Sequence, residues 1–427
     1  MTGTSPPMVL LPADGAARIE SWGASWGFID IRRDSAEDLL VISGISQKEA
    51  LRLPTQSAWQ SDHFLRHADQ TPRVGPWYEV DATLHEVHRQ AMLRGGLSVS
   101  PDLVRQAVQN GWRFPPVDAQ MPVLTWSPVQ GGVALWSMWW ISKDAATPGA
   151  LEVVTDTSPL TDLADAWPVD DLRAASVVIV GLGSIGSVVA ETLASYAVGH
   201  LTLVDPDRLL RHNLVRHRLG RRDIGRLKVN AMANLLQDRY PDVQIERHPI
   251  NVIYDADLMR PLFAHADLVI GATDGVASRR VINHLARRAQ VPAVLACVLE
   301  DGALGEVVRV RPGTGCLLCY RAKLEADGSM DPEPDLDQDY SLGSHHLPMT
   351  AVAGDLATVG TLAGKVAVAT LLERRGRWAQ RLPGDVALIG LQPVPDLPAP
   401  FDLERAAEVR WSHIGPSSID CPTCAAA

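Results

Sequence analysis

Apolar and polar positions alternate in blocks along the second part of the chain. Short apolar runs are followed by longer segments in which apolar residues recur every three or four positions. The runs predict strands at 176–180, 201–204, 268–272 and 293–296, and the longer segments predict helices at 188–196, 228–240 and 278–289. Strands that alternate with helices imply a parallel sheet with helices on both faces. We therefore expect an α/β unit of the doubly wound Rossmann type, with a mostly parallel sheet.

The pattern changes after residue 320. Residues 321–346 are acidic, contain proline and show no periodicity, which is typical of a mobile loop. A long segment rich in small residues predicts a helix at 349–372, and an apolar run predicts a strand at 386–391.

The first 165 residues are patterned differently. Short apolar runs at 26–31, 39–42 and 133–141 predict strands, and a helix is expected near 100–110. Ten of the twelve tryptophans lie between Trp22 and Trp167. Clustered tryptophan is more typical of a core than of a binding surface, although it also serves as an interface anchor. We expect a smaller Trp-rich α+β domain at 1–165 that recognises a partner or substrate, a linker or short helix at 158–175, and a second domain at 166–427.

Composition narrows the class of protein. The chain has 427 residues, 46% hydrophobic and 21% charged, with a net charge of −11. This acidity argues against nucleic acid as the main partner. The longest strongly apolar stretch, at 133–141, is too short to cross a bilayer, and the N-terminus has no signal-peptide pattern. We expect a cytoplasmic protein with no membrane segment.

Four of the five cysteines form two C-x-x-C pairs, Cys316 with Cys319 and Cys421 with Cys424. Two such pairs supply the four thiolates that a tetrahedral structural zinc site needs. The alternative is two independent thiol pairs in a reducing cytoplasm. The fifth cysteine, Cys297, follows a predicted buried strand.

Gly181, Gly183 and Gly186 form a G-x-G-x-x-G motif between a predicted strand and a predicted helix. In that context the glycines let backbone N–H groups approach the phosphates of a nucleotide. Asp205 closes the next strand 19 residues after Gly186, where a carboxylate can accept hydrogen bonds from ribose hydroxyls. Taken alone, these features suit a nicotinamide enzyme equally well.

Residues further along favour a triphosphate. Arg216 and Lys228 lie 11 and 23 positions beyond Asp205 and can neutralise phosphate charge. Asp274 follows the predicted strand at 268–272, where a carboxylate can hold Mg²⁺. Each of the three has a simpler explanation, as a solvated helix charge or a helix cap. Their order around a glycine loop favours an ATP site.

At this point the chain resembles the ThiF/MoeB/HesA adenylyltransferases, relatives of the ubiquitin-activating enzymes. The resemblance covers about residues 173–424 and rests on VVIVGLGSIGS, LVDPDRLLRHNLVRHRL, DIGRLKV, DLVIGATDGVASR, CLLC and CPTC. It implies binding of ATP and Mg²⁺, and attack of a protein's C-terminal carboxylate on the α-phosphate. It also implies that Asp205 or Asp207 binds ribose, that Asn213, Arg216 and Lys228 contact phosphate, and that Asp274 coordinates Mg²⁺. In this chemistry positioning and charge neutralisation predominate, and the catalytic residues are Arg216, Lys228 and Asp274.

The chain departs from the family pattern in three places. His217 follows Arg216 where relatives have glutamine. No R-Y-x-R-Q segment, which supplies an arginine finger in many members, precedes Ser176, so Arg32 or Arg33 is the candidate. Residues 320–372 contain no cysteine for a thioester, and Cys297 is expected to be packed as a small apolar side chain. His345 and His346 are expected to be an exposed polar pair, with a proton-shuttle role as the alternative.

The resemblance leaves three functions open. The first is activation of a ubiquitin-like or sulfur-carrier protein by a homodimer, with the acidic loop as a lid over the carrier's flexible tail. A conjugating enzyme would then be a further partner, as in bacterial ubiquitin-like pathways, some of which serve antiviral defence. The second is modification of a ribosomal peptide, and the third is a non-catalytic scaffold.

Overall fold

The chain folds into two compact units, Met1–Asp156 and Thr157–Ala427. The computed structural model describes residues 8–425 except 35–38, 56–68, 70, 110, 116–117, 129–131, 156–158, 330–350, 377–379 and 393–395. The division lies nine residues before the boundary expected from the sequence.

The first unit contains a mixed sheet in the order β8-β7-β6-β5-β2-β3-β1-β9, with β4 paired to β3. Most neighbours are antiparallel, and the parallel pairs are β1 with β3, β1 with β9, and β5 with β6. Its strands are β1 (Val9–Pro12), β2 (Trp26–Asp34), β3 (Leu39–Gln47), β4 (Leu53–Pro54), β5 (Arg73–Glu79), β6 (Met121–Ser127), β7 (Leu135–Ile141), β8 (Ala146–Gly149) and β9 (Leu151–Val154). Its described helices are α1 (Ala13–Ser21), α3 (Thr83–Leu93) and α4 (Pro101–Ala107).

Aromatic side chains fill both faces of this sheet. Successive strand residues point to opposite faces, so Trp77 and Trp140 join one core while Tyr78 and Trp139 join the other. All four are at most 6% exposed. Trp77, Trp139 and Trp140 are therefore core residues, as expected for clustered tryptophan.

The second unit is built on the sheet β12-β11-β10-β13-β14-β15-β16-β17. Five strands run parallel: β10 (Ser176–Val180), β11 (His200–Val204), β12 (Gln244–His248), β13 (Leu268–Gly271) and β14 (Ala293–Leu299). Three antiparallel strands extend the edge: β15 (Leu304–Val310), β16 (Val386–Gly390) and β17 (Val409–Ser412). The chain crosses from β12 back to β13 on the other side of β10. In such sheets, ligands bind where the strand order reverses, at the carboxyl ends of the strands.

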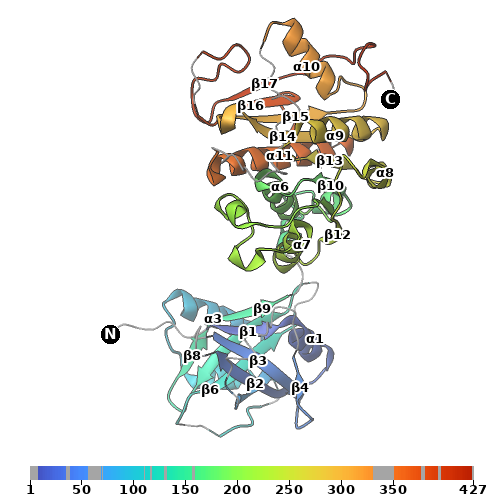
Figure 1. Cartoon of the computed structure of the whole chain (residues 1–427). Helices are drawn as coiled ribbons and strands as arrows, with labels where there is room; N and C mark the ends of the chain where they lie inside the picture. Colours follow the sequence, from blue (N-terminus) through green and yellow to red (C-terminus); the bar gives the residue numbers. More distant parts are fainter. Residues whose placement is uncertain are drawn as a thin grey trace. The chain divides into compact units, whose positions relative to one another are not determined.

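Helices cover both faces of this sheet (Figure 1). Val177 and Ile179 pack with residues of α6 (Ser184–Ser195), α7 (Lys228–Arg239) and α11 (Ala353–Arg374). Val178 and Val180 pack with residues of α8 (Ala256–Ala264), α9 (Val276–Arg288) and α10 (Leu317–Ala326). Shorter turns complete the unit: η1 (Pro159–Leu163), α5 (Val169–Arg173), η2 (Arg211–Val215), η3 (Arg221–Asp223) and η4 (Glu300–Gly302). The mixed α/β fold expected from the sequence is confirmed.

Several predicted boundaries were wrong. Helix α6 begins at Ser184, four residues earlier than predicted, because the helix starts within the glycine motif. Residues 321–326 belong to α10 and are not part of a loop, because Leu317, Tyr320 and Leu324 give that segment a buried face. The rest of the acidic segment, from residue 330, lies outside the described residues.

The apolar stretch at 133–141 is not the longest in the chain. Helix α11 is long and apolar enough to span a membrane by length and composition, although 67% of that apolar window is buried. It packs against α6 through two close approaches: a Cβ on Gly360 or Gly364 would lie 2.8 Å or less from a side-chain atom of Val188 or Thr192. These contacts are those of a core helix.

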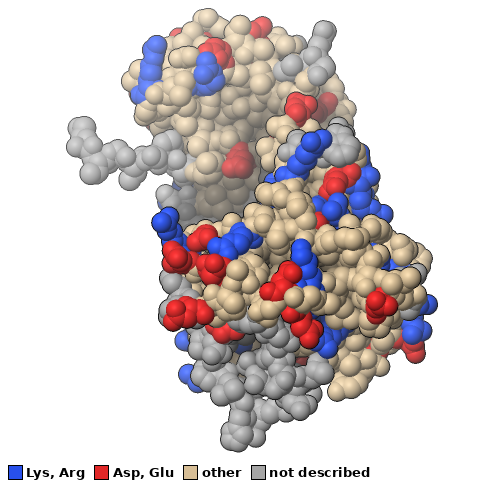
Figure 2. Space-filling model, turned by 90° about the horizontal axis from the view of Figure 1, so that it is seen from above, with Lys and Arg blue, Asp and Glu red and all other residues tan. Residues whose placement is uncertain are grey.

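Charged side chains of both signs are interspersed on the face shown in Figure 2. Lys and Arg lie beside Asp and Glu there, without a continuous field of one sign. The expectation that nucleic acid is not a partner stays a prediction.

Candidate functional site

The glycine loop connects β10 to α6 at the point where the strand order reverses. Gly181 has a φ of +89°, a conformation that L side chains rarely adopt, and a Cβ there would lie 2.5 Å from the carbonyl oxygen of Ala272. A Cβ on Gly186 would lie 1.8 Å from the carbonyl oxygen of Gly181. Gly183 has no atom within 4 Å of a Cβ and is the N-cap of α6. Two of the glycines are therefore required by packing, and the third leaves the helix N-terminus open.

Asp205 at the end of β11 fixes this loop. Its Oδ2 accepts a hydrogen bond from the Leu182 N–H at 2.7 Å, and its Oδ1 accepts one from the Asp207 N–H at 2.9 Å. The residue is only 5% exposed. Its carboxylate is therefore already engaged by the backbone. Asp207 is half exposed and is the better placed of the two to meet a ribose.

Lys228 opens α7 beside the two aspartates. Its Nζ lies 2.9 Å from Oδ2 of Asp207 and 3.8 Å from Oδ1 of Asp205, and its side chain is 9% exposed. Burial acts to lower the pKa of Lys228, but the two carboxylates outweigh it and the pKa is raised. Burial raises the pKa of Asp205, while Lys228 and the backbone donors oppose it. The lysine therefore carries its positive charge at neutral pH.

Asn213 lies on the 3₁₀ turn η2, and Arg216 is the C-cap of that turn. The Asn213 side-chain oxygen accepts a hydrogen bond from the Leu210 N–H at 2.8 Å, and the Arg216 N–H donates to the Asn213 carbonyl at 3.0 Å. Asn213 therefore holds the turn that presents Arg216. Its Nδ2 group makes no hydrogen bond within the described residues and can donate to a ligand.

Asp274 follows β13, the strand next to the glycine loop. Crowding by protein raises the pKa of Asp274, while Arg216, Lys228 and Arg279 lower it. The side chain is nevertheless exposed, so water weakens the crowding effect. The preceding residue, Thr273, accepts a hydrogen bond from Ser278 Oγ at 2.6 Å, which ties this segment to α9. An exposed carboxylate close to three cations suits a metal shared with phosphates.

His217 contacts the backbone of the glycine loop. It is 9% exposed, its Nε2 lies 2.6 Å from the Leu182 carbonyl oxygen, and its Nδ1 accepts a hydrogen bond from the Leu219 N–H at 3.1 Å. The sequence identified this position only as a departure from a family pattern. Arg279, 3% exposed and close enough to act on Asp274, was missed as well.

A surface hollow of about 920 Å³ lies over η2 and η3. Cationic and apolar side chains line it together: Arg211, His212, Leu214, Val215, Arg221 and Ile224. None of the predicted site residues lines it, although Asn213 and Arg216 belong to the same segment.

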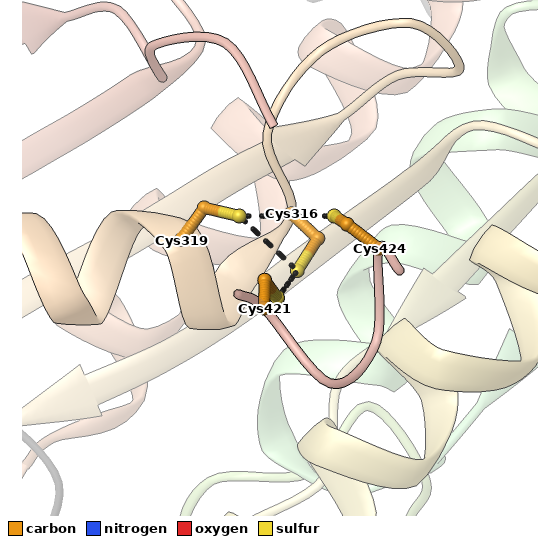
Figure 3. A group of neighbouring side chains, drawn as sticks. All are labelled: Cys316, Cys319, Cys421 and Cys424. Carbon is orange, nitrogen blue, oxygen red and sulfur yellow. Dashed lines mark hydrogen bonds between the residues drawn. The ribbon is translucent and has the colours of Figure 1, made fainter. Parts of the chain in front are cut away.

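The four paired cysteines meet at the N-terminus of α10 (Figure 3). Their sulfurs lie within 4.8 Å of one another, with 3.6 Å between Cys316 and Cys421 and 3.7 Å between Cys319 and Cys424. A disulfide needs about 2.05 Å. Four thiolates at about 2.3 Å from a tetrahedral zinc lie about 3.8 Å apart. The cluster therefore fits a zinc ion with no open position.

The chain brings these cysteines together by a close backbone contact. The Gly315 N–H donates to the Gly415 carbonyl at 2.9 Å, and a Cβ on Gly315 would lie 2.9 Å from that same oxygen. The Leu317 N–H donates to Asn283 Oδ1 at 3.0 Å, which fixes the loop to α9.

Cys297 lies on β14. It is 7% exposed, and its sulfur lies 3.8 Å from Oε2 of Glu306, a buried carboxylate paired with Arg321. Arg32 and Arg33 lie on β2 of the first unit, and His345 and His346 lie outside the described residues.

The family model described as "ThiF family" matches residues 160–373, which is half of the chain. Ubiquitin-like modifier-activating enzyme 5 of Drosophila ananassae is 31% identical over 159 residues, covering 35% of this chain and 40% of that protein. Molybdopterin-synthase adenylyltransferase of Escherichia coli K12 is 34% identical over 149 residues, covering 35% of this chain and 59% of that protein. The chain thus spans about half the length of the curated relatives it matches.

The solved structure of E. coli MccB with ATP has a TM-score of 0.45 and 20% identity, covering 60% of this chain and 68% of that one. The structure of E. coli MccB alone has a TM-score of 0.46 and 20% identity, covering 60% and 66%.

Proposed function

This chain belongs to the ThiF family, and from that premise we propose that it adenylates the C-terminal carboxylate of a carrier protein with ATP and Mg²⁺. The carboxylate oxygen attacks the α-phosphorus, a mixed acyl–phosphate anhydride forms, and pyrophosphate leaves. A thiol or amine then attacks the acyl carbon and AMP is released. The observation that carries the proposal is the set of cations and carboxylates around the glycine loop.

The phosphate site would combine backbone and side chains. The open N-terminus of α6 at Gly183 supplies N–H groups and the positive end of the helix dipole. Lys228, Arg216 and the Nδ2 group of Asn213 add charge and donors. Because Lys228 is already paired with Asp207, the phosphates compete with a carboxylate for this ammonium. Asp207, with one oxygen on Lys228 and half of its side chain exposed, would bind the ribose.

Asp274 is the residue that would hold Mg²⁺. This ion binds through one or two carboxylates and completes its shell with water and phosphate oxygens, so a single exposed carboxylate among cations fits it. When bound, Mg²⁺ neutralises charge on the phosphates during the transfer. The side chains of Arg216 and Lys228 would neutralise the same phosphate charge.

The cysteine cluster would hold a structural zinc ion. Four thiolates leave no position for a substrate, and the site links α10 to the C-terminal segment, which are more than 90 residues apart in the chain. Zinc would therefore stabilise this end of the sheet and take no part in the adenylation.

The carrier would be a ubiquitin-like or sulfur-carrier protein with a flexible tail, and the acceptor an external thiol or amine. The burial of Cys297, which is 7% exposed, supports direct transfer of the adenylate without a thioester on this cysteine. The first unit would recognise the carrier or a conjugating enzyme. We place the enzyme in the cytoplasm as a homodimer.

The proposal is tested by ATP–pyrophosphate exchange with the full chain and purified candidate carriers. Exchange should require Mg²⁺ and a carrier with a free C-terminal carboxylate, and it should be lost when the carrier's last residue is amidated. Exchange that proceeds equally with the amidated carrier would contradict the proposal. A leader-containing ribosomal peptide in place of the carrier tests the second function expected from the sequence.

A further inference from the structure

Buried side chains hold Leu182 in the glycine loop from both sides. Its N–H donates to Oδ2 of Asp205 at 2.7 Å, and its carbonyl oxygen lies 2.6 Å from Nε2 of His217. Leu182, Asp205 and His217 are 0%, 5% and 9% exposed. Both contacts are therefore shielded from water. In such a buried place, the loss of a hydrogen bond is costly because water cannot replace the missing partner.

The partners of His217 fix its tautomer. Leu219 has only an N–H to offer, so Nδ1 must be the acceptor at 3.1 Å. The single proton of the neutral ring is then on Nε2, which donates to the Leu182 carbonyl. Burial lowers the pKa of His217 to about 4, and the hydrogen bond to the Leu182 carbonyl opposes it. Lys228 and Arg216 lower the pKa further, while Asp223 raises it. The ring stays neutral at physiological pH.

The contact between His217 and the Leu182 carbonyl also orients the next N–H group, that of Gly183. The Leu182 carbonyl and the Gly183 N–H belong to one planar trans peptide, so they point in opposite directions. A hydrogen bond from His217 to the carbonyl therefore directs the Gly183 N–H away from His217. Gly183 is the N-cap of α6, and nothing lies within 4 Å of where its Cβ would be.

We propose that His217 is a positioning residue for the nucleotide: it locks the Leu182–Gly183 peptide so that the Gly183 N–H faces the phosphates. This role rests on the proposed ATP site and deepens it. The histidine needs both of its contacts, one as donor and one as acceptor. A glutamine at this position can supply the same pair, with its amide N–H and its carbonyl oxygen.

The test compares His217→Ala with His217→Gln in the full chain. His265→Ala is the matched control, because His265 also contacts a backbone carbonyl, that of Pro261 at 2.7 Å, but is exposed at the end of α8. We expect the Kd of MgATP to rise about 10-fold in His217→Ala. His217→Gln and His265→Ala should stay within about 2-fold of wild type, since both keep the loop contact. Unchanged binding by His217→Ala, or equal weakening by the glutamine variant, would overturn the role.

Nitrogen-15 NMR of the imidazoles and the backbone supplies a readout that needs neither nucleotide nor carrier. At pH 7, His217 should show a protonated Nε2 and an unprotonated Nδ1. The amide signal of Gly183 should shift in His217→Ala and stay in place in His217→Gln. A protonated Nδ1 would overturn the inference even if His217→Ala fails to fold. A wild-type chain that shows these signals but does not bind MgATP would refute the proposed function while the loop contact stands.

Discussion

The ammonium of Lys228 lies 2.9 Å from Oδ2 of Asp207, and this pair joins the start of α7 to the segment that follows β11. Asp205, 3.8 Å away, makes the lysine a shared partner of two carboxylates. Replacing Lys228 with alanine leaves the buried Asp205 without its cation. We expect a loss of about 3 kcal/mol in the free energy of unfolding and about 100-fold slower pyrophosphate exchange.

Thermal unfolding and exchange rates measure the two effects. Lys323→Ala is the control, because Lys323 is an exposed lysine on α10. Exchange that is equally slow in both variants would argue against a specific role for Lys228.

Asp274→Asn should separate activity from stability. The side chain is exposed, so its change to an amide should leave the melting temperature close to that of the wild type. Loss of the carboxylate should raise the Mg²⁺ concentration needed for exchange and slow the reaction by about 100-fold. A Mg²⁺ titration measures this, with the exposed Asp257→Asn on α8 as control. An unchanged Mg²⁺ requirement would remove Asp274 from the metal site.

The cysteine cluster predicts one zinc ion per chain. Cys319→Ser should lose the metal and lower the melting temperature of the second unit, because the site joins distant segments. Cys297→Ser should keep the metal, since Cys297 is not in the cluster. Elemental analysis with differential scanning calorimetry tests both. A metal-free wild type with an unchanged melting temperature after chelation would contradict the assignment.

The glycines of the loop should differ in their tolerance of alanine. Gly186→Ala places a Cβ 1.8 Å from the Gly181 carbonyl oxygen and should destabilise the fold by about 3 kcal/mol. Gly183→Ala meets no atom within 4 Å and should fold like the wild type. Denaturant unfolding of the two variants makes the comparison, and equal stabilities would show that the packing described for this loop is wrong.

The buried His217 predicts a dependence of stability on pH. Its folded-state pKa of about 4 lies below the unfolded value of about 6.5, so the unfolded chain binds a proton more readily between these values. The contribution is complete above pH 6.5 and is lost as the pH falls toward 4, by up to about 3 kcal/mol. His85, whose pKa is also lowered to about 4 by burial, should act likewise in the first unit. His217→Gln should flatten the acid limb of unfolding for the second unit, and an identical limb would contradict this account.

The sequence predicted four of the five parallel strands of the second sheet and missed β12, whose polar residues give no apolar run. Strands β10, β11 and β13 are short apolar runs buried on both faces, and each is followed by a helix with its own periodicity. Strands β15 and β17 were missed, because their place depends on pairing with β14 and β16 across long segments of chain. The strand order of the first unit's sheet could not be predicted for the same reason, because β1 pairs with β9, which is far away in the sequence.

Motif spacing predicted several residues of the candidate site, but it missed Arg279 and did not predict the contacts between the residues. Motif spacing identified Asp205 and Lys228, but it could not show that Asp205 holds the loop backbone while Asp207 remains half exposed. Nor could it show that His217 contacts Leu182, 35 residues away in sequence. These contacts depend on how the loop after β11 folds back over the glycine motif.

The intact mass of the carrier after reaction tests the central claim most directly. The full chain is incubated with MgATP and a candidate carrier, the reaction is quenched in acid, and the carrier is examined by mass spectrometry. The account predicts a carrier heavier by one adenylyl group, located on its C-terminal residue and formed about 100-fold more slowly with Asp274→Asn. A carrier that stays unmodified across the candidates, or an adenylyl group attached to a side chain of the carrier, would contradict it.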